Sequence, residues 1–177
     1  MSILTDTIRK QFKEGDDIRD EGLTTPDTVQ RFDNILYGDD PEWNTMDLYI
    51  PKEEKEKLPI IISFHGGGWV YGDKERYQYY CMSLAERGFA VINFTYRLAP
   101  EFKHPAPLVD MNQVAHWIMN HAKDYFLDTE HIYGVGDSAG AHLLTLYASI
   151  LTNREYASTY SFKAPEGFHF NALALNC

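Results

Sequence analysis

The chain has 177 residues, 44% of them hydrophobic and 14% aromatic, so it can form a domain with a core and lies outside the range of disordered chains. Its net charge of −10 argues against nucleic acid or an anionic membrane as the main partner. The sequence has no secretory signal pattern, no run near the ~18 apolar residues of a membrane span, and no metal-binding or redox spacing of its two cysteines. We therefore expect a soluble cytoplasmic protein without a membrane span, a metal or a cofactor.

The first 57 residues predict a short helix and an antiparallel pair of strands. Residues 3–13 are weakly amphipathic and predict a helix, whereas the charged residues 15–27, which contain glycine and proline, predict a loop. Apolar residues favour strands at 29–36 and 46–50, joined by a turn rich in glycine, aspartate and proline. Residues 52–57 mix charges of both signs and predict a solvated connection.

From residue 59 onward, strand and helix patterns alternate. Strands are predicted at 59–65, 89–94 and 172–175, helices at 73–84 and 108–123, and a loop at 153–169. Asp73 is the expected N-cap of the first of these helices, and Gly88 is its expected stop. This alternation predicts the α/β class, with a mostly parallel sheet and helices on both faces.

The central motif of the chain is Gly136-Asp137-Ser138-Ala139-Gly140. Residues 132–135 predict the end of a buried strand, and from His142 onward the apolar residues have helical spacing. A G-x-S-x-G sequence between a strand and a helix is typical of a nucleophile elbow, a tight turn that holds a serine hydroxyl above the sheet. This context predicts Ser138 as a catalytic nucleophile, which needs an adjacent base to take its proton.

A glycine-rich loop follows the strand predicted at 59–65. It reads His65-Gly66-Gly67-Gly68-Trp69. Three consecutive glycines are entropically costly unless the backbone requires their conformational freedom. Such a loop can turn backbone N–H groups toward a developing oxyanion, and the N–H of Ala139 can complete the set.

Together with Tyr96-Arg97-Leu98-Ala99-Pro100-Glu101, these two motifs make the chain resemble the hormone-sensitive-lipase branch of the α/β-hydrolase esterases over roughly residues 45–177. The resemblance implies an α/β-hydrolase fold and a serine carboxylesterase that hydrolyses small, short-acyl esters through an acyl-enzyme. By similarity, Ser138 is the catalytic nucleophile, the oxyanion hole consists of Gly67, Gly68 and Ala139, and the loop is supported by His65 and Gly66.

The resembling family places its triad Asp and His beyond the nucleophile, after later strands, so neither is assigned here. We expect residues 1–177 to form a single incomplete domain, truncated after the strand that follows the nucleophile helix. Residues 1–25 are expected to contribute to a cap over the active site, or else to form a frayed terminal helix. The apolar strand at 172–175 would lack a neighbour, and we expect a second chain or self-association to cover its edge.

The residues leave some alternatives open. A non-catalytic small-ligand-binding relative, or an inactive fragment, is the alternative to an esterase. His142 lies one helical turn after Ser138, but its place on the helix behind the elbow favours a packing or surface role over a local dyad. Residues 134–139 also match the dinucleotide fingerprint G-x-G-x-x-A, with Glu155 near the acidic offset, yet that interpretation leaves the HGGG loop unexplained.

For four residues near the motifs, the sequence predicts only a general role. Arg97 and Glu101 are expected to be structural, with the arginine fixing the loop under the site. Trp69 and Tyr71 follow the glycines and are expected either to line a substrate pocket or to join the core.

Overall fold

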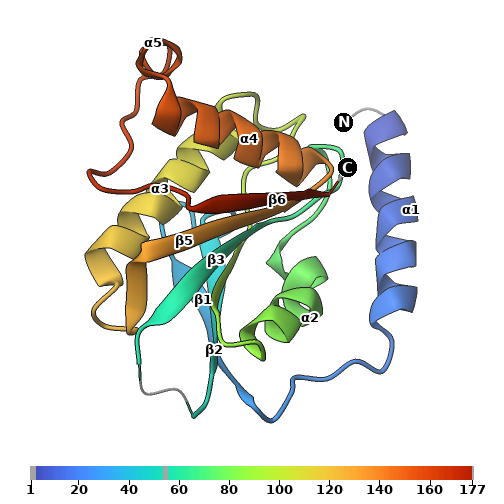
Figure 1. Cartoon of the computed structure of the whole chain (residues 1–177). Coiled ribbons are helices and arrows are strands. Elements are labelled where there is room, and N and C mark those ends of the chain that lie inside the picture. The colour runs from blue at the N-terminus through green and yellow to red at the C-terminus, as the bar shows by residue number, and fades with distance from the viewer. Residues whose placement is uncertain (1–2, 54–55, 177) are drawn as a thin grey trace.

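The computed structural model of the chain describes residues 3–53 and 56–176, which form an α/β fold around a six-stranded sheet (Figure 1). The strands are β1 (Val29–Leu36), β2 (Thr45–Pro51), β3 (Leu58–Phe64), β4 (Ala90–Phe94), β5 (Leu127–Asp137) and β6 (Ala172–Asn176). The helices are α1 (Ile3–Asp20), α2 (Lys74–Ala85), α3 (Ala106–His121), α4 (Ala139–Thr152) and α5 (Arg154–Ala157). None of these described helices combines the length and the apolar character needed to cross a membrane.

The sheet has the order β1-β2-β4-β3-β5-β6 and changes from antiparallel to parallel pairing at β4. β1 pairs with β2, and β2 with β4, in antiparallel register, whereas β4, β3, β5 and β6 run parallel. Parallel neighbours require crossover connections, and α2, α3 and α4 lie in those connections. The predicted mostly parallel α/β sheet and the antiparallel pairing of the first two strands are both confirmed.

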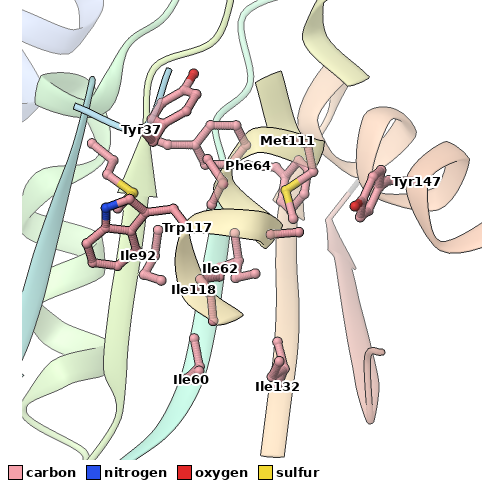
Figure 2. Close-up of a cluster of buried hydrophobic side chains, with 14 of the residues drawn as sticks. Tyr37, Ile60, Ile62, Phe64, Ile92, Met111, Trp117, Ile118, Ile132 and Tyr147 are labelled. Carbon is pink, nitrogen blue, oxygen red and sulfur yellow. The ribbon is translucent and has the colours of Figure 1, made fainter. Parts of the chain in front are cut away.

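Different helices cover the two faces of the sheet. Alternate residues of a strand point to opposite faces, so Ile60 and Ile62 join a core with α3 and α4, whereas Ile61 joins a smaller core with α2. Figure 2 shows the larger core, which Met111 enters from α3 and Tyr147 from α4. Each fully buried isoleucine contributes ~1.5–3 kcal/mol relative to exposure, so these alternating strands hold the helices against the sheet.

The N-terminal helix is longer than the sequence predicts. α1 continues through residues 15–20, where a loop is expected. Ion pairs along its surface join Lys13 to Asp17 at 2.5 Å and Arg19 to Asp16 at 2.7 Å. Opposite charges three or four residues apart stabilise a helix, so charges that suggest a loop instead extend the helix.

Other boundaries also shift. β5 begins at Leu127, earlier than expected, and its pairing with β3 is irregular between Pro59 and Ile60. α4 begins at Ala139, three residues before the predicted helix, and the short α5 interrupts the predicted loop at 153–169. The predicted N-cap of α2 is confirmed, because the Asp73 carboxylate accepts the N–H of Arg76 at 3.0 Å.

Within the described residues, β6 forms an open edge of the sheet. It pairs with β5 on one side, and all five of its residues are exposed. Leu173 and Leu175 are 37% and 48% exposed. An apolar strand with free backbone N–H and C=O groups is a favourable place for another strand to pair.

Candidate active site

Ser138 lies at the turn between β5 and α4, at the carboxyl end of the parallel strands. Its backbone has a φ of +48° and a ψ of −110°, a strained conformation for a residue with a Cβ. Its N–H donates to the carbonyl of Asn176 at 2.7 Å, and its own carbonyl accepts the N–H of His142 at 3.1 Å. The turn therefore leaves the side chain of Ser138 exposed, as a nucleophile elbow requires.

The glycine loop lies beside Ser138 because β3 and β5 are neighbours. Their register aligns Phe64 with Gly136, so the segments that follow both strands leave the sheet at one edge. Gly67 and Gly68 have φ values of +118° and +61°, which glycine adopts without steric cost. These two residues thus give the loop a shape that other residues would strain.

The backbone N–H groups at this edge differ in their partners. The N–H of Gly66 donates to the Tyr77 hydroxyl at 3.0 Å. Within the described residues the N–H groups of Gly67 and Gly68 have no hydrogen-bond partner, and that of Ala139 lies in the first turn of α4, where no intrahelical acceptor exists. Unoccupied backbone donors of this kind can stabilise an oxyanion. Gly67, Gly68 and Ala139 remain the candidates for that role.

His65 is fully buried beneath the loop. Its ring stacks on Tyr96 with centroids 3.9 Å apart, and its Nδ1 lies 2.8 Å from the carbonyl oxygen of Gly66. Burial lowers the pKa of His65 to about 4, so the ring is neutral at physiological pH, and Nδ1 is the donor to Gly66. A neutral, buried ring in these contacts supports the loop and is not accessible as a base for Ser138.

A cavity of about 510 Å³ opens beside Ser138. Three segments line it: α1, the glycine loop with α2, and the nucleophile turn. From α1 come Phe12, Asp16 and Arg19, and from the opposite side come Tyr71, Tyr77 and Asp137. No histidine lines this cavity in the described part of the chain. The arrangement therefore places an exposed serine hydroxyl beside unpaired backbone N–H groups and charged side chains.

Polar contacts attach α1 to the loops around the site. Figure 1 shows that this helix lies to one side of the sheet and does not pack on either of its faces. The Arg9 guanidinium donates to the Val70 carbonyl at 2.7 Å and to both carboxylate oxygens of Glu101 at 2.8 and 2.7 Å. The Tyr71 hydroxyl donates to Asp16 at 2.8 Å. Only Thr5 of α1 is buried, so its attachment depends on these polar contacts more than on a core.

A second, more apolar cavity of about 420 Å³ lies beyond Trp69. Trp69 is 47% exposed and meets the ring of His142 edge-on at 5.5 Å. His142 is itself exposed and lines this second cavity rather than the Ser138 cavity, in keeping with the surface role expected for it. Of the two aromatic residues after the glycines, Tyr71 therefore lines the Ser138 cavity and Trp69 the neighbouring one.

The Tyr96–Glu101 motif contributes two ion pairs. Arg97 is 2.7 Å from the fully buried Asp110 of α3, which fixes the loop after β4. Glu101 pairs with Arg9 of α1. Among residues that contact the site, sequence reasoning missed Tyr77, whose position in a tyrosine-rich helix gave no signal of its contacts.

No cluster of three or more potential metal-ligating side chains occurs among residues 3–53 and 56–176. The groups that line the Ser138 cavity include hydroxyls, backbone amides and charged side chains. A parallel sheet with a G-x-S-x-G turn after one central strand and a glycine loop after its neighbour defines the α/β-hydrolase class.

Comparison with known proteins agrees with this class. The BD-FAE family model matches residues 46–174, and the chain belongs to that family. It is 31% identical to ethyl acetate hydrolase of Pseudomonas putida over 157 residues, 86% of this chain and 49% of that protein. It is 37% identical to versiconal hemiacetal acetate esterase of Dothistroma septosporum over 97 residues, 54% of this chain and 30% of that protein.

A solved structure is also similar over nearly the whole chain. Esterase B from Lactobacillus rhamnosis, in a crystal structure with a tributyrin phosphonate, superimposes with a TM-score of 0.90 at 30% identity. The match covers 97% of this chain and 56% of that one. The resemblance to α/β-hydrolase esterases is confirmed, and the chain spans between 30% and 56% of the length of these three proteins.

Proposed function

We propose that the chain carries the nucleophile and the oxyanion hole of a serine carboxylesterase. The observation that supports this most strongly is the strained Ser138 beside Gly67 and Gly68, whose N–H groups have no other partner in the described residues. A serine held in this way can attack an ester carbonyl while backbone donors receive the negative charge on its oxygen.

In the proposed reaction, Oγ of Ser138 attacks the carbonyl carbon of the ester, and a base accepts the hydroxyl proton. The carbonyl oxygen becomes an oxyanion, which the N–H groups of Gly67, Gly68 and Ala139 stabilise. The ester C–O bond then breaks, and the alcohol leaves with the proton from the base. Water attacks the acyl group through the same base, which releases the acid and restores Ser138.

The base and its orienting carboxylate are proposed to come from outside the residues that line this cavity. In the resembling esterases both follow later strands. The exposed edge of β6 supports the same arrangement here, because a further parallel strand can pair there. We therefore propose that a C-terminal portion, on this polypeptide or on a second chain, covers the edge and supplies the base; self-association is the alternative cover.

The substrate is proposed to be a small ester with a short acyl group. A cavity of about 510 Å³ lies within the range of ~300–1,000 Å³ typical of small-molecule sites. Similarity to an ethyl acetate hydrolase points in the same direction. Residues 1–25 are proposed to act as a cap, since α1 lines the cavity, and the low cysteine content supports a cytoplasmic location.

Covalent labelling tests this function. The protein is expressed from its longest reading frame and treated with an organophosphonate probe, and the modified peptide is located by mass spectrometry. Labelling at Ser138 that disappears in Ser138→Ala is expected, because the probe traps the activated serine. Labelling at another serine would overturn the assignment, and ester binding without labelling or turnover would favour the small-ligand-binding alternative.

A further inference from the structure

Tyr77 of α2 lies between the glycine loop and the nucleophile turn. Its hydroxyl accepts the N–H of Gly66 at 3.0 Å and donates to Oδ2 of Asp137 at 2.5 Å. Gly66 directly precedes the oxyanion candidates, and Asp137 directly precedes Ser138. A single phenolic oxygen therefore bridges the two segments whose relative position an acyl-transfer site must control.

The direction of these hydrogen bonds is fixed by the groups involved. Oδ1 of Asp137 accepts the side-chain N–H of Asn176 at 2.9 Å, and the backbone N–H of Gly66 can only donate. The Tyr77 proton must therefore point to Asp137, which leaves an oxygen lone pair for Gly66. Burial and the hydrogen bond to Asp137 raise the pKa of Tyr77, so it remains a protonated donor at neutral pH.

The bridge also accounts for the glycine at position 66. Gly66 is not among the residues with positive φ, so its backbone conformation does not require glycine. A Cβ at this position would lie 2.8 Å from Oδ2 of Asp137 and 2.9 Å from the Tyr77 hydroxyl oxygen. The tyrosine–aspartate pair therefore packs directly against the Cα of Gly66 and leaves no room for a side chain at this position.

We propose that Tyr77 is a positioning residue of the oxyanion hole. It holds the N–H of Gly66 away from the substrate carbonyl and keeps the donors of Gly67 and Gly68 at a fixed distance from Ser138. This inference rests on the proposed esterase function. Donors stabilise an oxyanion effectively when they are in place before the charge develops, and a displacement of ~1 Å can reduce the rate by ~10²-fold.

Tyr77→Phe tests the proposal because it keeps the ring and removes only the bridging oxygen. For the protein expressed from its longest reading frame, we expect kcat for p-nitrophenyl acetate to fall ~10- to 100-fold, with little change in KM. Affinity for a boronic acid that mimics the tetrahedral intermediate should fall by the same factor as kcat/KM. Tyr80→Phe is the matched control on the same helix, since the Tyr80 hydroxyl has no hydrogen-bond partner within the described residues, and kcat should be retained.

A second readout does not depend on activity. In the protein expressed from its longest reading frame, the amide resonance of Gly66 should shift and its hydrogen exchange should accelerate in Tyr77→Phe but not in Tyr80→Phe. Asp137→Asn is a second variant for the case in which Tyr77→Phe does not fold. The asparagine amide has one acceptor oxygen for two donors, Tyr77 and Asn176, so it weakens the bridge. Asp137→Asn should therefore lower kcat relative to the unmodified protein, and an unchanged kcat would contradict the positioning role.

The outcomes separate this proposal from the esterase function. Turnover that persists in Ser138→Ala would overturn the function itself. If Ser138→Ala is inactive but Tyr77→Phe keeps its kcat and the Gly66 amide is unchanged, the positioning role alone is wrong. Equal losses of kcat in Tyr77→Phe and Tyr80→Phe would also overturn it, because they would reflect helix packing rather than the bridge.

Discussion

The backbone N–H of Ser138 donates a hydrogen bond of 2.7 Å to the carbonyl oxygen of Asn176, the last residue of β6. The side chain of Asn176 also donates to Asp137 at 2.9 Å. The turn that presents the candidate nucleophile is therefore held by an edge strand whose residues are all exposed. Order at this edge and geometry at the serine are coupled.

The first prediction concerns the open edge at β6. We expect the isolated 177-residue chain to self-associate or aggregate, because Leu173 and Leu175 are exposed on an unblunted edge. Leu173→Lys should shift the chain toward monomer in light scattering and native mass spectrometry, since a charge on an edge opposes strand pairing. Leu36→Lys on β1, at the opposite edge, is the matched control and should leave association unchanged.

A clear result would contradict that prediction. The unmodified chain would have to remain monomeric at high concentration and show slow amide exchange at residues 172–175. Slow exchange there would mean that the edge is already covered from within the chain.

The second prediction concerns Ser138. In the longest reading frame, Ser138→Ala should reduce kcat for short p-nitrophenyl esters by more than ~10³-fold, because the acyl-enzyme can no longer form. Steady-state kinetics on protein whose fold is checked by circular dichroism measure this loss. Undiminished turnover would show that Ser138 is not the nucleophile.

The third prediction concerns the 177-residue chain by itself. No histidine lines the Ser138 cavity in the described residues, so we expect little or no esterase activity from the isolated chain. Oxyanion donors and binding without the triad can still leave a residual ~10³–10⁴-fold acceleration over water. Steady-state kinetics on the isolated chain, with its mass verified, measure this activity. Full activity would mean that the chain contains a base, and His142 or His104 would have to be reconsidered.

The fourth prediction concerns the attachment of α1 and its pH dependence. The hydrogen bonds from Arg9 lower the pKa of Glu101, so the pair stabilises the docked helix above the ordinary glutamate pKa and loses this contribution as pH falls through the lowered value. Because the pair is partly exposed, it is worth no more than ~1 kcal/mol. Amide exchange in α1 should therefore accelerate in acid, with α3 as the internal reference.

Substitution of the same carboxylate gives an independent measurement. Glu101→Gln should accelerate exchange in α1 at neutral pH and remove most of its acid dependence. Glu130→Gln, an exposed residue near the start of β5, is the control and should change neither. Equal exchange in both variants would mean that other contacts dock the helix.

The amino-acid sequence by itself determined the strands, the sheet class and the two loops of the site. The reason is that each depends on local chemistry: alternating isoleucines in β3 form a buried strand, and Gly67 and Gly68 permit positive φ angles. The serine of the G-x-S-x-G turn is likewise defined by its immediate neighbours.

Only the tertiary structure decided how these parts meet. The register of β3 and β5, which aligns Phe64 with Gly136, sets the two loops side by side. The bridge through Tyr77 and the position of α1 beside the cavity depend on hydrogen bonds between residues far apart in the chain. Periodicity reports which face of a helix is apolar, but a hydroxyl or a carboxylate finds its partner only when the packed sheet brings the two together.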